Sequence, residues 1–452
     1  MGKKLPIFLF IFILLYVIGS LICYPMLTKR HVLKQKEKYA EQAAKETVDR
    51  RASVRCLDDN TQALVYRLAL IESAQRELIM TTFDMSDGES GQDLMAAMLQ
   101  AADRGVRIRL MVDGINAWLK LEKSDLFGAF STHPNIEIRF YNPIRLTKLW
   151  KLNYRMHDKY LIADDKAYIL GGRNSNNLFL GAYRDCLLYT SPSPRDASDV
   201  YKRQDDYACL MDAKAYFEKI WVQPDQKIFR KKETEKTKEG LALLREHYKE
   251  LQTAYPGAFS ETETLLTQDL IRVDSIQFLH NPLYADEKVP VVYQRICQEM
   301  EQGETILIQT PYIICDKGMY QDLSELCRAG KQIEIITNAV ESGANPWGCT
   351  DYLNERKSIL KTGAGVYACM AGQSLHTKTV LIDDETSIVG SYNLDLRSTY
   401  LDTELMLLVK SKELNKQLRD QAAAYQEKSA YEKAGKPVSY THLRAHETRS
   451  NL

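Results

Sequence analysis

The sequence predicts a duplicated α/β protein. We expect two similar lobes, each a mixed, mostly parallel sheet flanked by helices, with a transmembrane helix at the N-terminus. Three observations lead to this fold class: a polar motif occurs twice with identical spacing, a strand–helix–strand pattern precedes each copy, and an uncharged apolar run lies near the start. A strand, a helix and a second strand form a parallel unit when the helix crosses over the sheet, so both faces of each sheet should be covered.

The apolar run extends over residues 5–27 and carries no charge. A bilayer requires about 20 residues of helix, so this run is long enough to span it. No small-residue cleavage site follows, which favours a retained anchor over a cleaved signal peptide. More cations follow the run than precede it, and the positive-inside rule then places the body in the cytoplasm, although long domains can cross regardless of charge.

Composition sets limits on the function. The chain of 452 residues is 45% apolar, enough for a large core. Lys and Arg number 60, as do Asp and Glu, so global charge gives no sign of nucleic-acid binding. The nine cysteines form no C-x-x-C pair, so neither a disulfide framework nor a zinc site is expected.

Two stretches, 186–204 and 438–452, resemble translated sequencing-adapter text. Each is polar, without periodicity and abrupt against its flanks. We therefore assign no metal-binding role to His442 or His446. The first stretch interrupts the chain just after the first motif copy, and the second suggests that the native C-terminus is lost beyond Pro437.

The expected organisation follows from these boundaries. The predicted segments are an anchor (1–28), a stalk (29–58), a first lobe (59–225), a charged helical connector (226–265), a second lobe (266–437) and the foreign tail (438–452).

Within the lobes, periodicity predicts matching elements. In the first lobe these are a helix over 61–74, a strand over 77–84, a helix over 94–102, and strands over 106–113, 136–141, 160–163, 167–170 and 207–211. In the second lobe they are a strand over 305–312, a helix over 323–329, strands over 332–337, 379–382, 387–389 and 405–409, and a helix over 411–435.

The repeated motif has the form H-x-K-x4-D-x6-G-x-x-N. Its first copy supplies His157, Lys159, Asp164 and Asn174, and its second copy supplies His376, Lys378, Asp383, Ser391 and Asn393. Alternation along a strand puts the histidine and lysine of each copy on one face, and the glycine turn can bring the asparagine beside them. Two copies facing each other would gather imidazoles, ammoniums and amides around an anion, which predicts a phosphate site.

Two histidines suit displacement at phosphorus. One can attack and form a phosphohistidine, while the other protonates the leaving alkoxide and then deprotonates the acceptor alcohol. A carboxylate should orient each histidine through its far nitrogen. Glu404 fits this place for His376; for His157 the candidates are Asp206 and Asp185, and the foreign stretch between them leaves the choice open.

These motifs resemble those of the phospholipase D superfamily, the HKD enzymes. The GGRN of the first copy and the GSYNLDLRS of the second are most similar to bacterial phospholipase D-type cardiolipin synthases, over roughly residues 60–425. One departure is Gly172, where many relatives have serine.

The resemblance implies phosphatidyl transfer through phosphohistidine, without metal or other cofactor, on phosphatidylglycerol or a similar phospholipid and an alcohol acceptor at the bacterial cell membrane. It assigns the nucleophile to His157 and acid–base catalysis to His376. Phosphate binding falls to Lys159, Lys378, Asn174 and Asn393, with Ser391 and Arg173 beside them as substrate-binding candidates. Asp164 and Asp383 are expected to tie the motif turns.

Three alternatives stay open. A phospholipase D hydrolase or a nuclease would share the chemistry up to phosphohistidine and use water as acceptor; the neutral charge and the apolar run argue against a nuclease. A membrane-tethered lipid-binding protein is the non-enzymatic alternative. Finally, residues 144–155 mix apolar and basic side chains, which fits either a packed loop with snorkelling cations or an interfacial element on anionic lipid.

Overall fold

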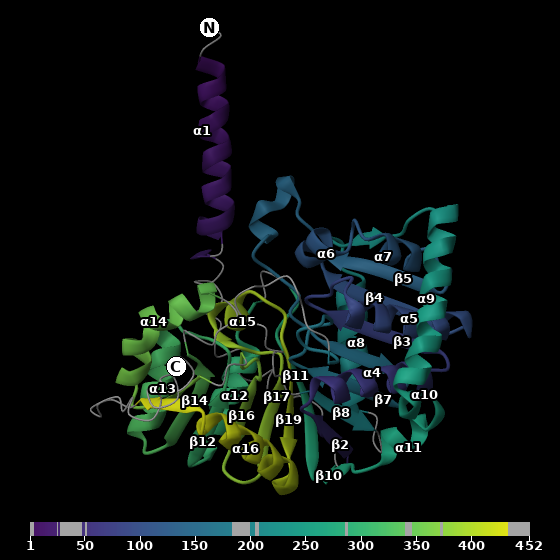
Figure 1. Ribbon diagram of the computed structural model, residues 1–452. Coiled ribbons are helices and arrows are strands. Elements are labelled where there is room, and N and C mark those ends of the chain that lie inside the picture. The colour runs from purple at the N-terminus through teal and green to yellow at the C-terminus, as the bar shows by residue number, and fades with distance from the viewer. Residues whose placement is uncertain are drawn as a thin grey trace, which may run out of the picture.

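The computed structural model describes residues 4–24, 26–27, 48–49, 52–182, 199–203, 208–284, 288–339, 346–370 and 374–432. Two α/β lobes lie side by side, and helix α1 (Lys4–Ile18) projects from them (Figure 1). Each lobe is built on a nine-stranded sheet. The predicted duplication is confirmed.

The first lobe has the strand order β10-β2-β8-β7-β6-β3-β4-β5-β9. In that order the strands are Ile271–Val273, Ala52–Leu57, Asp199–Arg203, Ala167–Gly171, Tyr160–Ala163, Glu77–Thr82, Arg107–Asp113, Ile136–Tyr141 and Lys227–Phe229. Its helices are α4 (Asn60–Ser73), α5 (Glu89–Asp103), α6 (Gly114–Lys120), α7 (Asp125–Phe130), the 3-10 turn η2 (Leu146–Lys151) and α8 (Ala208–Trp221).

The second lobe has the order β1-β11-β19-β17-β16-β12-β14-β15-β20. Its strands are, in that order, Val48–Asp49, Ser275–His280, Leu405–Lys410, Thr386–Gly390, Thr379–Ile382, Thr305–Gln309, Gln332–Asn338, Gly365–Cys369 and Ser429–Glu432. Its helices are α12 (Val291–Gln302), α13 (Lys317–Arg328), α14 (Pro346–Lys361), α15 (Leu396–Tyr400) and α16 (Lys412–Gln426), and β13 (Ile313–Ile314) pairs with β18 (Leu394–Asp395).

The charged connector forms helices α9 (Glu235–Ala254), α10 (Pro256–Ser260) and α11 (Thr262–Thr267). These helices pack on the first lobe, where Leu244, Tyr248 and Leu251 join its buried core. The connector is therefore a covering layer of the first lobe, with its charged face outward, rather than a free linker.

Both sheets are mixed, as predicted, but most of their strand pairs are antiparallel, so the expected majority of parallel pairs is wrong. Within each nine-stranded sheet, parallel pairing occurs in β3–β4–β5 and in β12–β14–β15, and the other pairs are antiparallel. The reason is that each motif copy is itself a hairpin, β6–β7 or β16–β17, which reverses the chain. Within the two nine-stranded sheets, the parallel pairs come from the helical crossovers before each motif.

An aspartate turns each hairpin and ties it down. Asp164 and Asp383 have φ values of 53° and 48°, in the left-handed region that aspartate tolerates. The Asp164 carboxylate accepts hydrogen bonds from the backbone N–H groups of residues 75–77 at 2.8–2.9 Å, and Asp383 accepts from those of Glu304 and Thr305 at 2.9 and 2.8 Å. Each aspartate thus fixes its motif hairpin to the start of the neighbouring strand.

The lobes share an apolar core between the two sheets. The buried cluster includes Ile162 and Leu170 of the first lobe and Leu381 and Leu407 of the second. Strand β1 precedes the first lobe in sequence but pairs with β11 in the second sheet. Residues 48–49 and 52–57 are therefore strands, so the predicted stalk over 29–58 does not extend to its expected end.

Two further element predictions need correction. Residues 207–211 were expected to form a strand, but helix α8 begins at Ala208 because its apolar residues recur at helical spacing and pack into the shared core. The place beside β7 is taken by β8, which lies inside the 186–204 stretch. The helix expected over 411–435 ends at Gln426, because Ser429–Glu432 forms the edge strand against β15.

Helix α1 continues into a π-helical turn, η1 (Gly19–Cys23). Its apolar side chains are exposed, with Phe10 at 66% and Phe12 at 69%. In the described ranges we find no helix with both the length and the apolar character that crossing a bilayer would require.

Candidate active site

The two motif copies meet at the interface between the lobes. His157 lies just before β6, where Met156 forms a parallel bridge with Thr403 of the second lobe. The His157 backbone N–H donates to Thr403 Oγ1 at 3.1 Å. On the other side, a Cβ atom at Gly172 of the first copy would lie 3.5 Å from the carbonyl oxygen of His376 and 3.6 Å from Lys378 Cδ. A hydroxymethyl side chain at position 172 would therefore point at the second copy.

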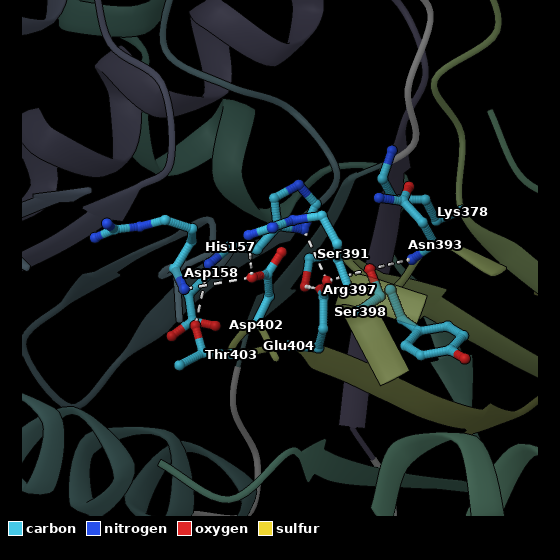
Figure 2. A network of polar contacts seen from close by, with 12 residues as sticks. His157, Asp158, Lys378, Ser391, Asn393, Arg397, Ser398, Asp402, Thr403 and Glu404 are labelled. Carbon is cyan, nitrogen blue, oxygen red and sulfur yellow. Dashed lines mark hydrogen bonds and ion pairs between the residues drawn. The ribbon is translucent and has the colours of Figure 1, made fainter. Parts of the chain in front are cut away.

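Glu404 orients His157, not His376. Its Oε1 lies 2.9 Å from His157 Nδ1, and the carboxylate is fully buried (Figure 2). The prediction that Glu404 serves the histidine of its own copy is wrong, because the residue before β19 reaches across the interface instead. Asp185 and Asp206, the predicted partners of His157, lie outside the described residues.

Two serines hold the Glu404 carboxylate in place. Ser398 Oγ donates to Oε1 at 2.6 Å, and Ser391 Oγ donates to Oε2. The Ser391 oxygen also accepts from the Leu405 backbone N–H at 3.0 Å. Ser391 was expected to bind substrate, but it lies behind the orienting carboxylate and fixes that group.

Each motif lysine folds back on its own histidine. Lys159 Nζ donates to the His157 carbonyl at 2.5 Å, and Lys378 Nζ donates to the His376 carbonyl at 2.6 Å. Lys378 Nζ also lies 3.0 Å from His376 Nδ1. The alternation predicted from the i, i+2 spacing thus places one imidazole and one ammonium together in each copy.

Aromatic rings support both imidazoles. Phe83 contacts the His157 ring edge-on at a centroid distance of 5.0 Å, and Phe179 contacts the His376 ring at 4.7 Å. Sequence reasoning missed both. Phe83 directly follows the end of β3, where side chains of parallel strands gather, and that signal could have pointed to it.

The two motif asparagines leave an acceptor unused. Asn174 and Asn393 are 6% and 7% exposed, and the Oδ1 atom of each is buried without a hydrogen-bond partner in the described part of the chain. An unsatisfied buried polar atom costs about 1–3 kcal/mol, and here it occurs at the same place in both copies. The matching pair marks where a polar ligand would bind.

Arg173 does not belong to this group. Its side chain is fully buried, and its guanidinium donates to Asn60 Oδ1 and to the backbone carbonyls of Asp58 and Phe179. It also pairs with Asp199 at 3.4 Å. The prediction that Arg173 binds substrate is wrong, because its donors secure the loop after β7.

Burial determines the protonation of the site. Desolvation, with the adjacent Lys159 charge, holds the pKa of His157 well below its usual value. Desolvation also raises the pKa of Glu404 to about 8 and lowers the pKa of Lys159 to about 8. The imidazole is therefore neutral at neutral pH. Its Nε2 lone pair is free in the tautomer in which Nδ1–H donates to the ionised Glu404, and the raised pKa of Glu404 makes this form more populated as pH rises towards 8.

Arg397 adds a third cation beside Lys159 and Lys378, and the sequence did not single it out. Its charge, like that of Lys378, disfavours protonation of His157, which places both cations near the imidazole. Its guanidinium donates to Asp402 Oδ1 at 2.9 Å and to the Asn153 carbonyl at 3.0 Å, and its side chain is 47% exposed. It lies in the GSYNLDLRS run, four residues after Asn393.

Comparisons with known proteins show which sequences and folds this chain is similar to. The family model described as "Cardiolipin synthase, PLD-like domain" matches residues 68–199 and 296–425. "Cardiolipin synthase C" of Escherichia coli (strain K12) is 26% identical over 390 residues, covering 79% of this chain and 81% of that protein. "Cardiolipin synthase" of Clostridium perfringens (strain SM101) is 23% identical over 362 residues, covering 80% and 67%.

Among solved structures, the phosphatidylserine synthase of Haemophilus influenzae superposes with a TM-score of 0.60 at 16% identity. The match covers 88% of this chain and 92% of that one. At this identity the likeness concerns the fold alone.

The opposite environments of two histidines give a titration prediction. As pH falls from 8 to 5, His247 should protonate first, because its hydrogen bond with Asp93 raises its pKa, whereas His157 should stay neutral well below pH 6.5. Long-range ¹H–¹⁵N spectra of histidine-labelled protein measure both, with His247→Gln and His157→Gln for assignment. Protonation of His157 at or above pH 6.5 would refute the expected order.

Proposed function

The chain belongs to the cardiolipin synthase family with a phospholipase D-like domain, and we propose that it transfers a phosphatidyl group from phosphatidylglycerol to an alcohol acceptor to make cardiolipin. The observation that carries this proposal is the cross-lobe pair of His157 and Glu404, set beside the second copy's His376 and Lys378. The family match and the named relatives support the same activity.

The first step is displacement at phosphorus. His157 Nε2 attacks the phosphodiester, a P–N bond forms, and the P–O bond to the glycerol head group breaks. His376 donates a proton to the departing alkoxide oxygen, which leaves as glycerol. Lys159 and Lys378 neutralise the charge on the non-bridging oxygens, and Asn174 and Asn393 bind the same group.

The second step reverses the first with a new alcohol. His376, now neutral, takes the proton from the hydroxyl of a second phosphatidylglycerol. That oxygen attacks phosphorus, the P–N bond breaks, and His157 returns to its neutral form hydrogen-bonded to Glu404. The product is cardiolipin, and no net charge is gained or lost across the two steps.

The enclosure of the site favours transfer over hydrolysis. His157 and His376 are 8% and 6% exposed, and both lysines are almost fully buried. Exclusion of water slows hydrolysis of a reactive phosphohistidine, so an alcohol that binds in the site can compete. A hydrolase would use the same residues with water as acceptor.

We place the enzyme at the bacterial cell membrane with an N-terminal anchor. The exposed apolar surface of α1 supports this location. The excess of cations after the apolar run, compared with the two lysines before it, supports a cytoplasmic body.

The activity is tested with labelled phosphatidylglycerol and the full chain. Cardiolipin and glycerol are the expected products, whereas phosphatidic acid alone would identify a hydrolase, and no product from a folded protein that binds the vesicles would favour a lipid-binding role. A phosphorus label on the protein that is released by acid but survives base identifies a phosphohistidine, because its P–N bond is acid-labile. Trapped phosphoenzyme should be lost in His157→Ala and kept in His376→Ala, and the reverse pattern would exchange the two roles.

The pKa of Lys159 predicts an alkaline limit on activity. Because burial lowers this pKa to about 8, the ammonium is charged below pH 8 and loses its charge as pH rises through about 8. Glu404 ionises over the same range, so kcat/KM, which reports the free enzyme, should rise towards pH 8 as the Glu404 carboxylate forms and fall above it as Lys159 loses its charge. Lys159→Arg is the matched control, since a guanidinium stays charged, and its residual activity should show no fall near pH 8. If kcat/KM of Lys159→Arg falls near pH 8 as it does in the parent protein, another group causes the alkaline limit.

A further inference from the structure

An exposed apolar face lies on the first lobe, beside the base of α1. We propose that α6 and η2, together with α1, form one surface that inserts into the hydrocarbon boundary of a phospholipid bilayer. This inference rests on the proposed function, because it concerns how the catalytic site meets its lipid substrate. Figure 1 shows α1 projecting from the end of the molecule at which α6 lies.

Four large apolar side chains form the face. Trp118 and Leu119 of α6 are 51% and 63% exposed, and Ile144 and Leu146 of the η2 segment are 42% and 78% exposed. Trp118 and Ile144 line the same cavity of about 450 Å³, which shows that the two elements adjoin. Exposed apolar residues gathered on neighbouring elements mark an interaction surface, whereas single exposed ones do not.

Helix α1 is fixed to this face by specific contacts. The Tyr16 hydroxyl donates to the Leu146 carbonyl at 2.9 Å and accepts from the Leu149 N–H at 3.3 Å. Nearer the body, Asn153 Nδ2 donates to the Leu21 carbonyl at 3.4 Å, and the rings of Tyr24 and Trp150 lie 6.5 Å apart. The helix and η2 therefore run alongside each other.

These contacts set the depth of η2 relative to α1. A helix rises about 1.5 Å per residue, so Tyr16 lies roughly 12 Å further along the axis than Tyr24. Leu146 is level with Tyr16 through their hydrogen bond. If the apolar part of α1 lies in the bilayer as far as Tyr24, the tip of η2 therefore lies in the bilayer as well. Tyr24 and Trp150 then lie at the depth where aromatic residues collect at membrane interfaces.

The charges on this segment favour apolar insertion over attraction to anionic lipid. Lys148 binds Asp225 Oδ1 at 2.6 Å, Lys151 binds Asp225 Oδ2, and Arg145 lies 3.5 Å from the same carboxylate. Lys227 beside them pairs with Glu122. The first three cations share one carboxylate, so their charge is partly compensated, and the apolar contact should form on neutral vesicles as well as on anionic ones.

The face connects directly to the catalytic strand. Arg155 Nε donates to Asp113 Oδ2 at 2.9 Å, and Asp113 Oδ1 accepts from the N–H of Ile115 at 3.1 Å as the N-cap of α6. Arg155 stands two residues before His157. Insertion of α6 and η2 would thus hold the entrance of the site at the lipid surface.

Depth-dependent quenching tests the contact with the full chain in neutral phosphatidylcholine vesicles brominated on the acyl chains. Leu119→Trp and Leu146→Trp should each add tryptophan emission that the bromolipid quenches. Leu243→Trp on α9 is the matched control, because Leu243 is 63% exposed, as Leu119 is. Equal quenching at all three positions, or none at 119 and 146, would overturn the proposal.

A second measurement separates this inference from the proposed activity. Leu146→Asp should lower transfer on long-chain vesicles about tenfold while leaving the rate on monomeric short-chain phosphatidylglycerol unchanged, and Leu243→Asp should change neither. An unchanged vesicle rate in Leu146→Asp would contradict the inserted face. Absence of short-chain transfer in the parent protein would instead refute the activity, and the quenching result would stand independently.

Discussion

The site depends on one buried hydrogen bond, between His157 Nδ1 and Glu404 Oε1. A fully buried carboxylate is costly unless donors surround it, and here two serine hydroxyls and an imidazole do so. The three donors come from both lobes, so the charge can be satisfied only when the lobes are docked. The same bond orients the imidazole and leaves Nε2 free. Docking of the lobes and preparation of the nucleophile are therefore a single event.

This coupling explains why the lobes are joined so extensively. An apolar core fills the space between the sheets, and β1 and β10 each pair in a sheet whose neighbouring strands lie far away in sequence. A displacement of about 1 Å between the lobes would break the bond from Glu404 and move Lys378 away from His157. The large interface is the rigid support that such a divided site requires. The mixed sheets serve the same end, because the motif hairpins bring both histidines to the facing side.

The sequence predicted features that depend on local spacing, and it failed where the outcome depends on docking. The motif strands fell at 160–163 and 379–382 as expected, because alternation and the turn aspartates are local properties. The partner of Glu404 could not be predicted, since the spacing is equally compatible with a histidine of either copy. Arg173 was predicted to bind substrate because of its place in the motif. Its side chain is buried instead, and its guanidinium donates to Asn60 Oδ1 and to the Asp58 carbonyl. Phe83 and Phe179 lie outside the motifs, and only the fold brings them to the imidazoles.

Strand β8 shows that the neighbouring strands of a sheet determine the conformation of the segment between them. The strand lies in the stretch that resembles adapter text, and Val200 and Tyr201 pack into the cores on opposite faces because alternation is built into any extended segment. Asp199 is buried and pairs with Arg67 and Arg173 of the first lobe. Lys202 is also buried, with its ammonium 5.7 Å from the centroid of the Tyr168 ring. The neighbours β2 and β7 thus determine that a strand forms, whereas the residues it carries determine how stable the lobe behind His157 can be.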